Sequence, residues 1–193
     1  MHTHPKYPTR SATWLLILAV IISSCQTTST TLSESQPPAE APAQEGAAPL
    51  STVSSLIGWL KNHPEQADER GCFTMDGVDV TDVDTVCIRQ HIQSLRTTGL
   101  FASSYLHGLE EEYARMQQAI KQEGYAASKD YDRYFNSQDP PAYDAALTQL
   151  GAAAQIKVAG PEATVAVTFT EPSYTLTYRL RQEDGKWKIA HID

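Results

Sequence analysis

Four aspartates lie close together near the middle of the chain, and carboxylates at short spacing are common calcium ligands. They are Asp76, Asp79, Asp82 and Asp84. A calcium-binding loop alternates its ligands along the chain and closes on a glutamate. These aspartates do not alternate in that way, and no glutamate follows at the closing position. We therefore interpret the stretch as a solvated loop that caps a helix, with a calcium site as the alternative.

The histidines do not form a metal or catalytic motif. The six of them are scattered, no two are spaced four residues apart on an expected helix, and His-Glu-x-x-His does not occur. Gly-x-Ser-x-Gly, Ser-x-x-Lys and a phosphate-binding glycine-rich loop do not occur either. The sequence therefore predicts no metal and no cofactor.

The composition favours one folded, acidic domain. Hydrophobic residues make up 41% of the 193 residues and charged residues 20%, which is enough for a core. The formal net charge is −8. Sequence-independent nucleic-acid binding needs a clustered positive surface, so we expect no nucleic-acid partner.

The N-terminus has the pattern of a secretory signal peptide. Lys6 and Arg10 make it positive, and a continuous apolar run follows over residues 14–22. Nine residues rise only ~13 Å in a helix, well short of the ~30 Å hydrocarbon core of a bilayer. We expect residues 1–24 to be a cleaved signal peptide, with an uncleaved membrane anchor as the alternative.

The end of this run, Ile22-Ser23-Ser24-Cys25, resembles the lipobox of bacterial lipoproteins. The resemblance implies that the signal is cut before Cys25, that the thiol of Cys25 carries diacylglycerol and that its amine is acylated. Two or three acyl chains hold a protein durably on a membrane. Because Gln26 and not aspartate follows, the resemblance implies the outer membrane, facing the periplasm, if the host is Gram-negative. An ordinary free or buried cysteine is the alternative.

Two further cysteines, Cys72 and Cys87, remain once Cys25 is lipidated. An even number of thiols in an oxidising compartment favours a disulfide. Their spacing is not Cys-x-x-Cys, so a redox site is not expected. Two buried free thiols are the alternative.

The chain divides at about residue 50. Residues 26–50 are rich in threonine, serine, proline and alanine, and such a stretch cannot bury enough surface to offset its ordering entropy. We expect the lipidated cysteine and a disordered tether over 25–50, and a single globular domain over 51–193.

Helical periodicity dominates the first half of this domain. Apolar side chains at Val53, Leu56, Ile57 and Leu60 predict a helix that ends before Pro64. Residues 64–81 have no periodicity and are predicted to be a loop. A second helix is expected from an N-cap at Asp82 to Gly99, and a third from Ser103 or Ser104 to Gly124.

The C-terminal part changes to a period of two. Apolar side chains alternate through four runs, which Gly160-Pro161, Glu171-Pro172 and Asp184-Gly185 separate. This pattern predicts a four-stranded antiparallel meander with one buried face. The fold class is therefore α+β, with N-terminal helices packed on a C-terminal bent antiparallel sheet.

Helices followed by such a sheet, with the ending Asp184-Gly185-Lys186-Trp187-Lys188-Ile189, resemble the nuclear-transport-factor-2-like, or cystatin-like cone, superfamily. The segments 99–101 and 132–139 further resemble a family of secreted bacterial domains of unknown function, whose pattern Asp132, Phe135, Gln138 and Asp139 fit. The resemblance implies a cone-shaped sheet and no particular activity.

Enzymes of the cone-shaped superfamily use a carboxylate or histidine in the cone with a tyrosine as proton donor. By that resemblance the catalytic candidates are Asp132, Asp139, Tyr178 and His191. The alternative, which we favour, is that Gln138 and Asp139 cap the turn before Pro140-Pro141, that Asp132 and Asp139 stabilise the fold, and that His191 is a core histidine. We thus expect a non-enzymatic binding or interaction domain for a small molecule or protein, with an acid–base enzyme as the alternative.

The lipidation hypothesis makes a direct prediction. Replacement of Cys25 by alanine removes the thiol that receives the lipid, so an uncut and non-acylated precursor should accumulate. Intact mass spectrometry and partition into detergent measure this outcome. Normal processing of the variant together with detergent partition would contradict the hypothesis.

Overall fold

The first helix begins earlier than the sequence pattern predicts. A computed structural model describes residues 43–129 and 131–193, which all belong to one compact unit. Helix α1 (Ala43–Asn62) starts inside the stretch interpreted as a tether, and its Leu50 packs against the core. The expected signal peptide, Cys25 and the tether up to residue 42 lie outside the described residues. Within the described part of the chain, no helix is long and apolar enough to cross a membrane.

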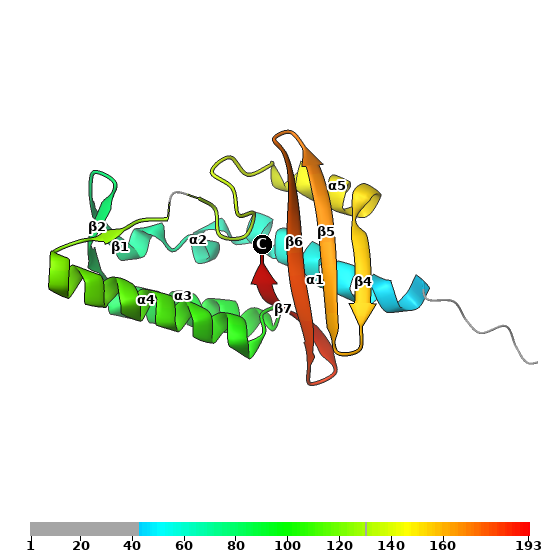
Figure 1. The fold of residues 1–193 in the computed structure, drawn as a ribbon, viewed down its shortest axis with the longest axis horizontal. Coiled ribbons are helices and arrows are strands. Elements are labelled where there is room, and N and C mark those ends of the chain that lie inside the picture. The colour runs from blue at the N-terminus through cyan, green and yellow to red at the C-terminus, as the bar shows by residue number, and fades with distance from the viewer. Residues whose placement is uncertain (1–42, 130) are drawn as a thin grey trace, which may run out of the picture. The chain divides into compact units, whose positions relative to one another are not determined.

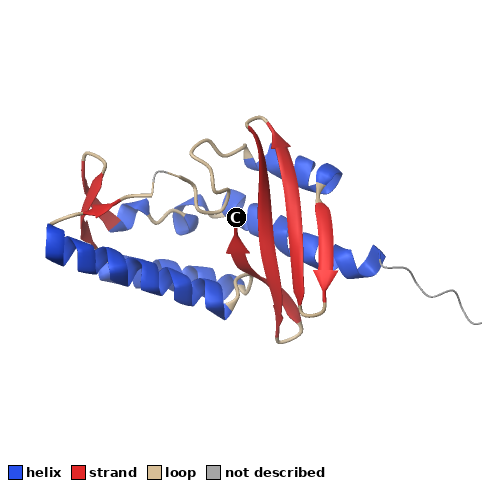
Figure 2. Cartoon of the chain, in the orientation of Figure 1, coloured by secondary structure: helices blue, strands red, loops and turns tan. Residues whose placement is uncertain are grey.

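The C-terminal part is the four-stranded antiparallel sheet that the alternating pattern predicts. Its strands are β4 (Gln155–Ala159), β5 (Glu162–Thr170), β6 (Ser173–Glu183) and β7 (Lys186–Ile192), in that order across the sheet (Figures 1 and 2). Each connection is a two-residue turn. At Asp184-Gly185 both residues have positive φ, 54° and 71°, a conformation that Asp-Gly adopts readily.

Helices cover one face of this sheet. Helix α1 contacts β4, β5 and β7, while α5 (Tyr143–Ala153) contacts both α1 and β5 (Figure 1). The predicted stripe of α1 is buried, and the sheet residues Val165, Val167, Phe169, Leu176, Tyr178 and Leu180 are each at most 2% exposed. The α+β class is confirmed. The face of the sheet that bears these residues is filled by packed side chains.

The remaining helices lie in the other part of the domain. Helices α3 (Thr85–Thr98) and α4 (Ser103–Glu123) pack against each other and end at Gly99 and Gly124, as predicted. The predicted N-cap of α3 at Asp82 is wrong. Asp84 caps the helix instead, because its Oδ1 accepts hydrogen bonds from the backbone amides of residues 86 and 87 at 2.8 and 3.0 Å. Asp82 lies in a strand, opposite Thr74.

That strand belongs to a second sheet, and the prediction of a loop over 64–81 is wrong. The segment contains α2 (Pro64–Ala67), a 3₁₀ turn (Arg70–Cys72), β1 (Phe73–Asp76) and the start of β2 (Asp79–Val83). A short strand, β3 (Ala126–Ala127), completes the order β1-β2-β3. Gly77 in the hairpin turn has a φ of 62°, which favours glycine. The dipeptide Asp76-Gly77 was the available signal for this hairpin.

The two parts of the domain join at the edge strand β7. The amide of Ala102 donates to the carbonyl of Ile189 at 2.8 Å, and the amide of Ile189 donates to Leu100 at 2.8 Å. The carboxylate of Glu183 accepts hydrogen bonds from the amide and hydroxyl of Ser103 at 3.1 Å, at the start of α4. These contacts cover the edge of β7 and fix α4 relative to the large sheet.

Cys72 and Cys87 form the predicted disulfide, with their Cα atoms 5.4 Å apart. The bond joins the 3₁₀ turn to the first turn of α3. It therefore holds the segment between α2 and β1 against α3.

Removal of this disulfide should destabilise the domain. A cross-link that closes a loop of about 15 residues contributes ~3 kcal/mol in the chain-entropy description, so Cys72→Ser should lower Tm by several degrees. Thermal melts with and without reductant measure the effect. The parent should gain the mass of two hydrogens on reduction, and thiols that alkylate without reductant would contradict the bond.

Candidate functional site

The catalytic candidates Tyr178 and Asp132 both hold the same loop. Tyr178 is fully buried on β6, and its hydroxyl donates to the carbonyl of Tyr134 at 3.2 Å. Oδ1 of Asp132 accepts the amides of Tyr134 and Phe135 at 2.8 and 3.0 Å. Burial outweighs these two hydrogen bonds and raises the pKa of Asp132. Both side chains thus stabilise the loop that follows β3.

The other two candidates lie at exposed positions. Asp139 is exposed, and its backbone amide donates to the Ser137 hydroxyl at 3.2 Å. The expectation that His191 is a core histidine is wrong, because its side chain is 63% exposed and contacts Asp193 at 2.8 Å. The register of β7 shifts so that Ile189 lies opposite Leu180 and His191 opposite Arg179. The extra residue between them turns His191 to the face opposite Ile189.

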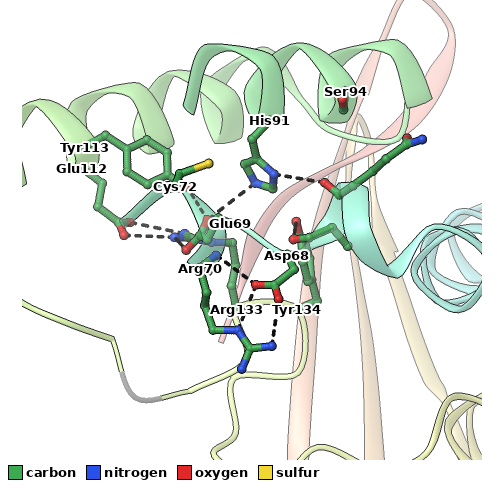
Figure 3. A network of polar contacts seen from close by, with 12 residues as sticks. Asp68, Glu69, Arg70, Cys72, His91, Ser94, Glu112, Tyr113, Arg133 and Tyr134 are labelled. Carbon is green, nitrogen blue, oxygen red and sulfur yellow. Dashed lines mark hydrogen bonds and ion pairs between the residues drawn. The ribbon is translucent and has the colours of Figure 1, made fainter. Parts of the chain in front are cut away.

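A buried charge cluster, which no motif in the sequence indicates, lies beside that loop (Figure 3). At its centre is Arg133, whose side chain is 11% exposed. Its Nε and Nη2 donate to the two oxygens of Glu69 at 3.0 and 2.6 Å. Its Nη2 and Nη1 also donate to Glu112 of α4 at 3.1 and 3.4 Å. Burial opposes the charge, but Glu69 and Glu112 outweigh it and raise the pKa of Arg133.

Three further side chains complete the cluster. The hydroxyl of Tyr113 in α4 donates to Oε2 of Glu69. The ammonium of Lys129 lies 2.8 Å from Glu112. His91 of α3 places its Nε2 atom 3.6 Å from Oε2 of Glu69. We call the set Glu69, His91, Glu112, Tyr113, Lys129 and Arg133 the Arg133 cluster.

A cleft opens over this cluster. Its volume is about 550 Å³, and Glu69, Glu112, Lys129 and Arg133 form part of its wall. The cleft is lined by residues of the segment 64–70, by loop residues within 128–129 and 131–140, and by apolar side chains such as Phe73, Met75 and Met116. Asp132 also lines this cleft. A smaller cleft of about 260 Å³ shares three of these cluster residues, Glu112, Lys129 and Arg133, and has His191 in its wall.

The carboxylates of the cleft are already occupied. Asp68 accepts a bidentate pair from Arg70 at 2.9 Å, which lowers the pKa of Asp68. Glu69 and Glu112 bind Arg133, and Asp132 binds backbone amides. Within residues 43–129 and 131–193, no group of three or more metal-ligating side chains is assembled. The aspartates Asp76, Asp79, Asp82 and Asp84 instead lie along the hairpin and at the start of α3.

Comparison of the chain with protein-family models, with curated proteins and with solved structures gave no significant match.

The contacts of Asp132 and Asp139 predict unequal effects of substitution. Asp132→Ala leaves two loop amides without their acceptor and should lower the free energy of unfolding by ~1–3 kcal/mol. Asp139→Ala changes an exposed side chain and should have an effect within about 0.5 kcal/mol. Thermal and denaturant melts of both variants measure the difference.

The variant Asp132→Asn separates a structural from a catalytic carboxylate. The asparagine side chain keeps an oxygen that can accept the hydrogen bonds of both amides. The free energy of unfolding of Asp132→Asn should therefore lie between those of the parent and Asp132→Ala. A catalytic carboxylate is often held in a destabilised state, and its removal can raise stability. An Asp132→Asn variant that melts above the parent would overturn the structural role.

Proposed function

We propose that this chain is a lipid-anchored domain of the bacterial cell envelope that binds a small amphipathic molecule or a short peptide segment in the 550 Å³ cleft. Binding and not catalysis is the proposed activity. The observation that carries the proposal is the cleft itself. Its charged groups hold one another in place through ion pairs and hydrogen bonds, and they lie beside apolar side chains. Ligand pockets commonly have volumes of ~300–1,000 Å³ and a few fixed polar groups in an apolar wall.

The surroundings of the cleft favour an amphipathic ligand. Phe73 and Met75 of β1 and Met116 of α4 supply apolar surface, while Arg70 and Lys129 keep donor capacity at the rim. The side chain of Arg70 is 87% exposed although it pairs with Asp68. A ligand with an apolar body and a polar group would bury the former and leave the latter at this rim.

The positions of the four catalytic candidates support binding over catalysis. Tyr178 is buried in the filled face of the sheet and Asp132 is engaged by loop amides, while His191 and Asp139 are exposed. The acid–base enzyme stays the second candidate on one observation. Asp132 lines the cleft and burial raises its pKa, as a general base requires.

The location of the domain is part of the proposal and derives from the lipobox resemblance at Cys25. A domain anchored by lipid and linked by a tether remains close to the membrane without a basic surface. The disulfide supports an oxidising compartment, because such bonds persist there and are rare in the cytosol. In a Gram-negative host the proposed site is the outer membrane, facing the periplasm.

Retention of a ligand tests the binding function. Native mass spectrometry of protein purified from its own envelope should show an added mass on the parent. Met75→Asp places a charge in the apolar wall and should remove most of that added mass.

Val78→Asp is the matched control for this experiment. Val78 is 78% exposed on the same hairpin and does not line the cleft, so this variant should retain the ligand. Absence of any added mass on the parent, or equal loss in both variants, would refute binding in this cleft.

A further inference from the structure

His91 is a buried histidine with one nitrogen left unsatisfied. Its side chain is 4% exposed on α3, facing the segment between α2 and β1 (Figure 3). Nδ1 lies 3.1 Å from the carbonyl oxygen of Gln66, which can only accept, so Nδ1 carries the hydrogen. In the neutral ring Nε2 then presents a lone pair, and it has no hydrogen-bond partner among the described residues.

Charged groups face this nitrogen from the elements packed around α3. Glu69, in the segment before β1, places Oε2 at 3.6 Å from Nε2. Asp68 of the same segment and Arg133 of the loop after β3 act on His91 through their charges. From α4, Tyr113 donates to the same Glu69 oxygen. A proton on Nε2 would therefore make a new donor aimed at an oxygen that Arg133 and Tyr113 already use.

We propose that protonation of His91 loosens the contact of Arg133 with Glu69 and opens the cleft, so that acidification regulates ligand binding. The protonated ring competes with Nε of Arg133 for Oε2 of Glu69, and it adds a positive charge close to the guanidinium. The effect of pH on ligand binding rests on the proposed binding function, whereas the opening of the cleft does not depend on that function.

The loop and not the Glu69 segment is the wall that moves. The Cys72–Cys87 bond ties the segment before β1 covalently to α3, and the contact between His91 and Gln66 ties it a second time. Arg133 is held to that segment by side-chain contacts with Glu69, of which the one to Oε2 competes with the protonated ring, and the neighbouring Tyr134 hydroxyl donates to the carbonyl of Ala67 in α2 at 3.3 Å. Residues 131–142, which carry Arg133 and line the cleft, are therefore the segment expected to open.

The direction of the pH effect follows from burial. Desolvation lowers the pKa of His91 below its ordinary value of 6.5, and it outweighs the opposing influence of Glu69. The open form, in which the ring is hydrated, takes up the proton more readily than the closed form. Closure is therefore fully favoured above about pH 6.5 and is lost as the pH falls towards the lowered pKa of the closed form.

Hydrogen–deuterium exchange of the full-length protein in detergent tests this device without any ligand. After correction for intrinsic exchange rates, protection of residues 131–142 should fall by up to about tenfold per pH unit between about pH 6.5 and 5.5, since opening takes up one proton. Strands β5 and β6 should keep their protection. His91→Gln keeps a donor for Gln66 but cannot titrate, so its loop should show no such fall.

His107→Gln is the matched control, because His107 is 70% exposed on α4 beside Glu110 and Glu111. This variant should behave as the parent does. A proton NMR titration of the His91 ring in the parent gives a readout that needs no variant, and its pKa should lie below 6.5.

The outcomes separate the two proposals. An equal fall of protection in His91→Gln and the parent, a fall spread evenly over β5 and β6, no fall in the parent, or a His91 pKa at or above 6.5 would each overturn the switch. Loss of the ligand mass on Met75→Asp tests binding alone, so the switch can fail while binding stands, and binding can fail while the loop still opens.

Discussion

The arrangement of the cleft depends on one interaction, the pairing of the buried Arg133 guanidinium with two carboxylates. Removing a charge from water costs several kcal/mol, and only good hydrogen-bond geometry to opposite charges offsets that cost. Arg133 meets this requirement by bonding two carboxylates from different segments, Glu69 before β1 and Glu112 in α4. Because both carboxylates bond the same guanidinium, this contact holds the loop, the segment before β1 and α4 in one relative position.

The large sheet supports this site without forming it. Its helix-covered face is filled, and Tyr178 reaches from β6 to the carbonyl of Tyr134 in the loop that carries Arg133. The cleft lies instead where the small sheet, α4 and the loop meet. The large sheet thus fixes the loop at Tyr134, next to Arg133, which the side-chain charges hold.

One extra residue in β7 keeps apart two of the catalytic candidates that the superfamily resemblance implies, Tyr178 and His191. Strict alternation along β7 would place His191 on the face of Ile189, but the register shift opposite Arg179 and Leu180 turns it to the other face. Tyr178, by contrast, keeps the alternation of β6 and is fully buried. The two side chains that would have to share a proton therefore lie on opposite faces of the sheet.

The sequence by itself determined the helical stripes of α1, α3 and α4, the meander of β4–β7 and the pairing of the only two cysteines among the described residues. Each of these depends on a local period, a turn dipeptide or a count. It did not determine α5, whose only fully buried side chains are Ala146 and Leu150, nor the strands β1–β3, which are only two to five residues long and of which β1 is largely exposed. The Arg133 cluster was likewise decided by tertiary structure. Its partners are separated by 21, 44 and 64 residues, and a charge that is buried only because distant segments meet leaves no periodic signal in the chain.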